Sequence, residues 1–567
     1  MKTKSAVCIL LILILSVSNA KSITPPYKSR ELLNQLIRLN DDDISNSLKW
    51  QWTDKNNVLC GAIFDGDSIV SPNGTAHFIQ KLMCSYVSPV STWYQSKELL
   101  NRMILAASGL ITLQHSDGTI DLVNANFHST PDLGFTIYPL ALAYSIMLQN
   151  NNLNYGELNS LMKRYMLKAG DALSVGGVHT PNHRWVITGA LAWLYQFFPD
   201  PKYKARAEQW LAEKVDIDPD GQYHERSTAV YTPVTNRSLI DIAQKMHYDY
   251  LYDHVRKNLD MTFYFVRSTG EIATESSNRQ DKYLISDMSG YYRFYRFMAL
   301  KDKDSRYSGM VDYIEKTVPL ANLGGMLPYF LEDPSMLQEL PKPTPLPTSY
   351  EKQFKFSDMV RIRDGESDMS IISNNSTFFS YFKGTAALEG MRISAAFFGR
   401  GQFQSEKIEK IGDTYILSSI IKGPYYQPLP KEKIPADGEA WGKVPRTERE
   451  QSEIQTLETK IYITKTDGKV KVKVSVNGPE NLPVSLELGF RKGGILSNVT
   501  KKEGADAVYL IKNGAIAQYS KDGNTITVGP GICKHKTTQL RGALPKLQAD
   551  CLYFTTYAPG EFEFTIE

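Results

Sequence analysis

Proline occupies every second position in the stretch Leu340-Pro341-Lys342-Pro343-Thr344-Pro345-Leu346-Pro347, and this stretch divides the chain. Neither a helix nor a central strand continues through such a run. Before it, between Leu33 and about Leu300, apolar residues recur every three or four positions, which predicts helices. After it the period becomes two, as in residues 470–476 (VKVKVSV), which predicts strands with one solvent-exposed face. We therefore expect a helical domain at 21–340, a linker at 341–348 and a β domain at 349–567.

The two halves differ in architecture as well as in period. Many helices in succession without intervening strands indicate packed helical hairpins. In the second half, Asp467-Gly468, Asn513-Gly514 and Asp522-Gly523 each lie between alternating runs and favour tight hairpins. The second domain is therefore predicted to be an antiparallel β-sandwich. A cleft between the two domains would be a natural ligand site.

Composition narrows the class of protein. The chain has 567 residues, of which 42% are hydrophobic and 22% charged, so it is too long for one compact core and too apolar for a disordered chain. The formal net charge is only +3. Because that near-balance creates no global field, we expect no nucleic-acid partner, and any acidic partner must be recognised locally.

The first twenty residues are typical of a secretory signal peptide. Lys2 and Lys4 precede an apolar run that ends before Ser18-Asn19-Ala20, which predicts cleavage after residue 20 and a secreted or periplasmic protein. No stretch approaches the roughly 18 uninterrupted apolar residues of a membrane span, so no membrane insertion is expected. Beyond this segment the chain has Cys60, Cys84, Cys533 and Cys551. Two local disulfides and buried free thiols are both compatible with their spacing, whereas a zinc knuckle is not, because no Cys-x-x-Cys pair occurs.

Unusual polar residues gather in four loops of the helical half. No P-loop, dinucleotide fingerprint, His-Glu-x-x-His or Gly-x-Ser-x-Gly motif is present. The four loops are residues 124–132, 179–185, 220–231 and 275–281. Helix capping and solvated charge pairs explain each loop taken singly. However, Asn182, His183 and Arg184 together at a helix start place donors beside the positive end of the helix dipole, which suits a carboxylate. If successive hairpins run in parallel, the loops share one rim of a helical toroid.

These motifs carry a resemblance to a known family. Asn182-His183 before an apolar helix, followed by Asp220-Gly221 and then by Glu225-Arg226-Ser227 leading to Tyr231, resembles the heparinase II/III-like polysaccharide lyases. The resemblance implies an incomplete (α/α) toroid of helical hairpins followed by an antiparallel β-sandwich, with a uronate-containing polysaccharide as partner. No cofactor is predicted, and no set of candidate ligands has the spacing that is diagnostic of a metal site. It also implies that Asn182 and His183 surround the substrate carboxylate and that Tyr231 acts at the scissile bond. Some members add a histidine from the β domain, and His535 is the only histidine after His254.

The residues suit β-elimination, in which the C5 proton of a uronate is removed and the bond to O4 breaks. The carboxylate charge must be neutralised, for which Asn182 offers an amide and Arg184 or Arg279 a cation. A tyrosine, with an ordinary pKa near 10, needs cationic neighbours such as a His183 imidazolium or Arg226 to act as a base. If proton and leaving oxygen lie on one ring face, Tyr231 serves both; otherwise His183, His128 or His224 is the second group. The substrate-binding candidates are Arg184, Asn126, His128, His224, Glu225, Arg226 and Arg279.

Two other classes of protein remain as alternatives. A toroidal glycoside hydrolase would need two carboxyl groups across the bond, and Asp132 with Glu225 would supply them. A non-catalytic glycan-binding protein would use tyrosine and tryptophan platforms. The loops are richer in Asn, His, Tyr and Arg than in paired acids, which favours elimination. Candidate substrates are glycosaminoglycans, alginate and plant glycans with glucuronate, and the resemblance extends to lyases that cleave rhamnose from glucuronate. The near-neutral charge favours a weakly sulfated glycan.

Overall fold

The structure is a computed structural model that describes residues 27–151, 153–466 and 468–567; the predicted signal peptide, residues 1–20, lies outside the described residues. The α-helices of the described residues are α1 (Tyr27–Ser47), α2 (Pro72–Val87), α3 (Lys97–Leu113), α4 (Thr130–Gln149), α5 (Gly156–Val175), α6 (Pro181–Phe197), α7 (Pro201–Ala212), α8 (Tyr231–Met246), α9 (Leu251–Thr262), α10 (Tyr292–Asp302), α11 (Ser305–Thr317), α12 (Leu327–Glu332) and α13 (Ala440–Lys443). The strands are β1 (Ile120–Leu122), β2 (Asn126–Ser129), β3 (Ser349–Phe354), β4 (Met359–Asp364), β5 (Ser367–Ile372), β6 (Phe379–Lys383), β7 (Ala386–Ala395), β8 (Ile408–Ile411), β9 (Thr414–Tyr426), β10 (Gln451–Thr466), β11 (Lys469–Asn477), β12 (Leu482–Phe490), β13 (Ile495–Ser497), β14 (Val499–Lys501), β15 (Val508–Ile511), β16 (Ala517–Lys521), β17 (Asn524–Gly529), β18 (Asp550–Ala558) and β19 (Gly560–Ile566).

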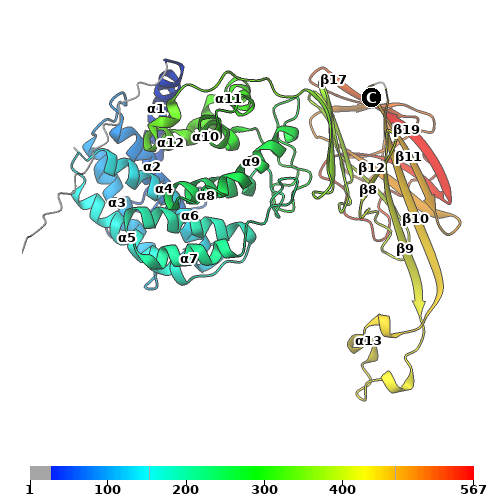
Figure 1. Ribbon diagram of the computed structural model, residues 1–567. Coiled ribbons are helices and arrows are strands. Elements are labelled where there is room, and N and C mark those ends of the chain that lie inside the picture. Colours follow the sequence, from blue (N-terminus) through cyan, green and yellow to red (C-terminus); the bar gives the residue numbers. More distant parts are fainter. Residues whose placement is uncertain (1–26, 152, 467) are drawn as a thin grey trace, which may run out of the picture.

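The helical domain is the incomplete toroid that the sequence predicts. Helices α2, α4, α6 and α8 pack side by side as an inner layer, and α3, α5 and α7 return outside them (Figure 1). Helix α4 is apolar on all sides because neighbours enclose it. Since each outer helix reverses the chain, successive inner helices run in the same direction. Helices α8 and α9 are separate because the chain turns at His247, which has a φ of 60°.

The β domain is a sandwich of two sheets. One sheet has the strand order β13-β16-β17-β19-β11-β10-β9-β8, and the other has the order β14-β15-β18-β12-β7-β6-β5-β4-β3. The pairs are antiparallel except for β15 with β18, which are parallel. On β11 the four valines of residues 470–476 are buried, as the alternation predicts. Strands β9 and β10 extend beyond the sandwich as an arm with α13 at its tip (Figure 1).

The predicted turns have different outcomes. Asp522 and Gly523 both adopt positive φ and join β16 to β17 in a tight hairpin, as predicted. The prediction for Asn513-Gly514 is wrong, because β15 and β16 belong to different sheets and the turn between them is a crossover. The turn at Asp467-Gly468 includes residue 467, which lies outside the described residues.

The structure also shows the state of the four cysteines among the described residues. Cys60, Cys84, Cys533 and Cys551 are free thiols, so the cysteines form no disulfides with one another.

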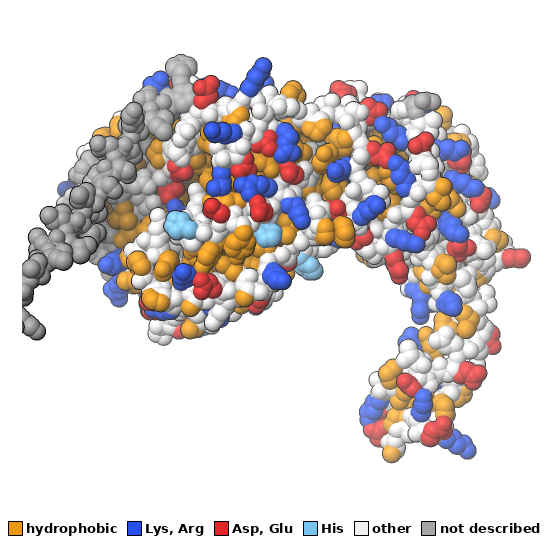
Figure 2. Space-filling view, viewed as in Figure 1, with side chains coloured by type: hydrophobic (Ala, Val, Ile, Leu, Met, Phe, Trp, Pro, Cys, Tyr) orange, Lys and Arg blue, Asp and Glu red, His pale blue; other side chains and the backbone are white. Residues whose placement is uncertain are grey.

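Among the described residues, no helix is both long enough and apolar enough to cross a membrane. Lys and Arg side chains are interspersed with Asp and Glu over the face that Figure 2 shows, so an acidic ligand has to be recognised by a local group of residues.

A buried ion cluster joins the two domains. The helical domain contributes Arg267 and Glu275, and the sandwich contributes Arg361 from β4 and Asp368 from β5; all four are buried. Arg267 lies 2.7 Å from Glu275 and 2.6 Å from Asp368. Arg361 approaches the same two carboxylates at 3.5 and 3.3 Å. Because two guanidinium groups face two carboxylates, the cluster is electrically balanced and fixes one domain against the other.

Candidate active site

Three inner helices begin at one rim of the toroid, and the predicted residues lie at these helix starts. Helix α4 begins after Ser129, whose side chain accepts a hydrogen bond from the Asp132 N–H. Helix α6 begins at Pro181, directly before Asn182 and His183, and α8 begins at Tyr231. Because α4, α6 and α8 are parallel neighbours, their positive dipole ends converge on the same rim. That arrangement favours an anion there.

Asn182 and Glu225 form a buried pair at this rim. The Asn182 Nδ2 donates to Glu225 Oε2 at 2.7 Å and to Thr180 Oγ1 at 3.3 Å. Burial raises the pKa of Glu225, although the hydrogen bond from Asn182 and the charge of Arg279 act in the opposite direction. The Arg279 Nε lies 3.5 Å from Glu225 Oε1. The Oδ1 of Asn182 is buried and has no hydrogen-bond partner among the described residues.

Tyr231 is held by the loop at 275–281. Its phenol oxygen accepts a hydrogen bond from Gln280 Nε2 at 2.7 Å, and the guanidinium carbon of Arg279 lies 4.9 Å from the centre of its ring. Sequence reasoning missed Gln280, although it follows Arg279 directly in a loop that was singled out. An amide donor and a cation beside one phenol stabilise negative charge that develops on its oxygen.

His183 is buried and its pKa is lowered, which disfavours the imidazolium among the two roles that the sequence leaves open for it. Burial lowers the pKa of His183 to about 4, the charges of His179 and Arg279 act in the same direction, and Asp132 acts against them. The ring lies edge-on to His179, with 4.7 Å between centroids, and to Phe135 on α4, with 6.0 Å. A neutral imidazole can accept a proton, so His183 suits the role of a base better than that of a cation.

Two of the predicted arginines are occupied elsewhere. Arg184 donates to Glu213 and Asp216 at 3.0 and 2.9 Å and covers the ring of Trp185. Arg226 donates to the Ser357 carbonyl at 2.9 Å and lies 3.4 Å from Asp358, so it ties the rim loop to the sandwich. Neither guanidinium contacts Tyr231 or Asn182 among the described residues.

Of the remaining candidates, three lie close in sequence to the helix starts, and His535 lies in the sandwich domain. Asn126, on β2, donates to Asp132 at 2.9 Å. His128 is exposed; its Nδ1 lies 2.8 Å from Asp117 and its ring stacks on His115. His224 is exposed in the loop that precedes α8. His535 is partly buried in the connection between β17 and β18, where its Nε2 lies 3.0 Å from the Thr556 carbonyl oxygen.

The sandwich influences the site by contacting the loop at 275–281 of the helical domain, rather than through His535. Glu275 accepts hydrogen bonds from Ser370 and, at 3.1 Å, from Ser380 of the sandwich. Although burial raises the pKa of Glu275, the charges of Arg267 and Arg361 and the bond from Ser370 outweigh it and lower the pKa to about 2. Asn375, in the turn between β5 and β6, donates to the Glu275 carbonyl at 3.3 Å. The carboxylate thus anchors the loop that presents Arg279 and Gln280.

The loop is braced on its other side by the helical domain. Asp281 accepts a hydrogen bond from Ser277 and another from the Ala229 N–H at 3.0 Å. The Asn278 N–H donates to the Glu225 carbonyl at 3.2 Å. The loop is therefore fixed between the sandwich and the start of α8, which sets the position of the partners of Tyr231.

The fold that carries this rim, a helical toroid followed by a β-sandwich, is a heparinase-like lyase fold. The chain is similar in structure to a xanthan lyase from Paenibacillus, with a TM-score of 0.57, 11% identity, and coverage of 96% of this chain and 58% of that one. It is similar to the chondroitin AC lyase of Streptomyces coelicolor A3 in complex with chondroitin sulphate, with a TM-score of 0.54, 11% identity, and coverage of 94% and 79%. It is also similar to heparinase III, with a TM-score of 0.52, 11% identity, and coverage of 96% and 85%. No protein-family model and no curated protein sequence matches the chain.

Proposed function

We propose that the protein is a polysaccharide lyase that cleaves a uronate-containing glycan by β-elimination. The observation that carries the proposal is the placement of Tyr231. Its phenol oxygen accepts a hydrogen bond from Gln280, its ring lies beside Arg279, and it begins one of three helices whose positive ends share the rim. The structures with this fold that the chain resembles are polysaccharide lyases acting on xanthan, chondroitin and heparin-type glycans, which supports the class of reaction.

The first task of such a site is to neutralise the uronate carboxylate. Arg279 supplies the cation, since its guanidinium is partly exposed and bonds Glu225 only at 3.5 Å. Asn182 supplies an amide donor by exchanging its longer bond, the one to Thr180 at 3.3 Å, for the substrate. Glu225 keeps the other N–H and so fixes the orientation of the amide. With its charge balanced, the carboxylate can accept the electrons of the enediolate that forms when the C5 proton leaves.

The second task is proton transfer. The C5 proton moves to the base, a double bond forms between C4 and C5, the bond from C4 to O4 breaks, and O4 takes up a proton. Where the C5 hydrogen and O4 lie on the same ring face, Tyr231 performs both transfers. Where they lie on opposite faces, the neutral imidazole of His183 takes the first proton and Tyr231 gives the second. Arg184 and Arg226 have no part in this scheme because acidic and backbone groups of the protein already engage them.

The hydrolase alternative receives less support from the same contacts. Asp132 accepts from Asn126 and Ser129, and Glu225 accepts from Asn182, so both carboxyl groups serve as internal acceptors. Ultraviolet absorbance decides between the reactions. A panel of uronate polysaccharides, including glucuronate with a rhamnose cap, should yield a product with a conjugated double bond. New reducing ends without that chromophore would establish hydrolysis instead.

A further inference from the structure

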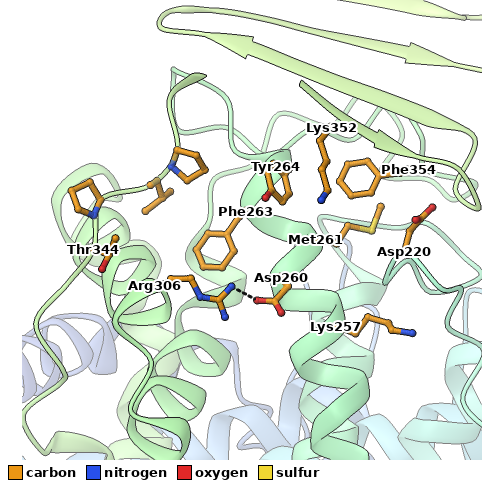
Figure 3. Close-up of a pocket in the computed structure, with 13 residues that line it drawn as sticks. Asp220, Lys257, Asp260, Met261, Phe263, Tyr264, Arg306, Thr344, Lys352 and Phe354 are labelled. Carbon is orange, nitrogen blue, oxygen red and sulfur yellow. Dashed lines mark ion pairs between the residues drawn. The ribbon is translucent and has the colours of Figure 1, made fainter. Parts of the chain in front are cut away.

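A cavity lies where the two domains meet at the linker. It has a volume of about 640 Å³ and is lined by the end of α9, the proline-rich linker and β3 (Figure 3). Phe263, Tyr264 and Phe354 supply aromatic walls. Asp220, at the start of the loop that carries Glu225, forms another part of the lining. The cavity falls in the size range of small-molecule sites and is larger than a single inorganic ion requires.

The two acidic groups of the cavity both have partners within the protein. Asp260 forms an ion pair with Arg306 at 3.1 Å, drawn as a dashed line in Figure 3, and accepts a hydrogen bond from the Tyr307 hydroxyl at 3.1 Å. Asp220 accepts hydrogen bonds from the backbone N–H groups of Phe356 and Ser357 at 2.6 and 3.0 Å. Asp260 is therefore paired with a cation, whereas Asp220 keeps its negative charge and is held by hydrogen bonds.

The two lysines of the cavity have no such partners. Within the described part of the chain, neither Lys257 nor Lys352 forms an ion pair with an acidic residue. The Lys352 side chain lies between Tyr264 and Phe354 and points into the cavity (Figure 3), and its Nζ is 5.2 Å from the centre of the Tyr264 ring. With Arg306 paired to Asp260, two lysines and the single carboxylate of Asp220 remain, so the cavity combines a net positive charge with aromatic faces. That pairing suits a ligand with an anionic group on an apolar ring face, which is the character of an acidic sugar.

We propose that this cavity is an accessory subsite that binds an acidic sugar unit of the glycan, with Lys352 on its carboxylate or sulfate and Tyr264 against its ring, while Lys257 adds positive charge at the far side of the cavity. The inference rests on the proposed function for the identity of the glycan. The chain between Asp220 and Glu225 limits the separation of their Cα atoms to about 18 Å. One glycan chain can therefore contact the cavity and the rim together, and two linked contacts raise the affinity for long chains above that for short ones.

The test compares the binding of ligands of two lengths to Tyr231→Phe, the variant whose turnover is expected to be at least about a hundredfold lower. Titration calorimetry on Tyr231→Phe would use chondroitin hexasaccharide, which carries carboxylates only, its sulfated counterpart, and the corresponding disaccharides. The additional change Lys257→Met with Lys352→Met should weaken hexasaccharide binding about tenfold and leave disaccharide binding unchanged. Lys355→Met, an exposed lysine outside the cavity lining, is the matched control and should change neither. A larger loss for the sulfated ligand would assign the lysines to sulfate, and an equal loss would assign them to the carboxylate.

Three results would overturn the inference. They are an unchanged hexasaccharide affinity in the double lysine variant, an equal loss for both ligand lengths, and no binding of either hexasaccharide to Tyr231→Phe. Thermal unfolding of each variant confirms that the surface substitutions leave the fold intact. The elimination assay on the unsubstituted protein is a separate measurement, so a lyase whose lysine variants bind normally would lose the subsite and keep the proposed function.

Discussion

Replacing Glu275 with glutamine tests whether the sandwich positions the active site. The substitution keeps the shape of the side chain and its hydrogen bonds to Ser370 and Ser380 but removes one of the two buried negative charges. Arg267 and Arg361 then share the single carboxylate of Asp368, which leaves one excess positive charge in the buried interface. Loss of one partner from a buried ion pair typically costs about 3–5 kcal/mol.

The pKa of Glu275 gives a similar value for the loss of stability. Its carboxyl is held at about 2 instead of the ordinary 4.5. At 1.36 kcal/mol per pKa unit, the charged form is favoured in the folded state by about 3 kcal/mol at neutral pH. Because the folded-state pKa is depressed, this contribution is complete above pH 4.5 and is lost as the pH falls toward 2. The stability gap between the native protein and Glu275→Gln should therefore narrow over that acidic range.

Two assays measure the consequences of Glu275→Gln. Urea denaturation followed by tryptophan fluorescence should show that the free energy of unfolding of Glu275→Gln at neutral pH is about 3 kcal/mol lower than that of the native protein. Turnover should also fall, because the loop that presents Arg279 and Gln280 to Tyr231 loses its anchor. Glu271→Gln is the control, since Glu271 also pairs across the interface, with Arg491, but is less buried and leaves Arg491 paired with Glu389. It should cost at most about 1 kcal/mol and preserve turnover. Native-like stability and turnover in Glu275→Gln would refute the positioning role.

Three further predictions concern the rim itself. Tyr231→Phe should lower turnover at least about a hundredfold while substrate still binds, and the exposed Tyr250→Phe should change nothing; near-normal turnover would remove Tyr231 from the mechanism. Asn182→Ala should lower kcat/KM on uronate polymers, and a fully active variant would contradict its role at the carboxylate. The pKa of His183 is about 4 in the folded state and about 6.5 in the unfolded state. The contribution of neutral His183 to the free energy of unfolding should therefore be fully present above pH 6.5, and the protein should lose up to about 3 kcal/mol of stability as the pH falls to 4. His183→Gln should abolish that decline in denaturation experiments, and an unaltered pH dependence would count against a buried neutral imidazole.

Local sequence signals located the helix starts and the strands but not the partners of each side chain. Pro181 and the apolar run after His183 mark the start of α6, and the alternating valines mark β11. Neighbouring residues on a helix point about 100° apart, so His183 faces the rim while Arg184 faces Glu213 and Asp216. The direction in which each side chain points depends on how α6 packs, which local spacing does not encode.

Long-range contacts explain the other differences. Gln280 reaches Tyr231 across 49 residues, and Glu275 meets Ser370 across 95. No local pattern specifies either pair. Asn513-Gly514 has the composition of a hairpin turn, yet a dipeptide fixes the bend and not the sheet that the next strand joins. The protonation state of His183 likewise follows from burial, which arises only when α4 and α6 pack together.

The most direct measurement of the central claim is the absorbance of the product released from a uronate polysaccharide by the native protein and by Tyr231→Phe. A rise in ultraviolet absorbance that accompanies each bond cleavage, and that disappears with the phenol oxygen, is the result expected from β-elimination at this rim. Cleavage with no new chromophore, or an equal rise from both proteins, would contradict it.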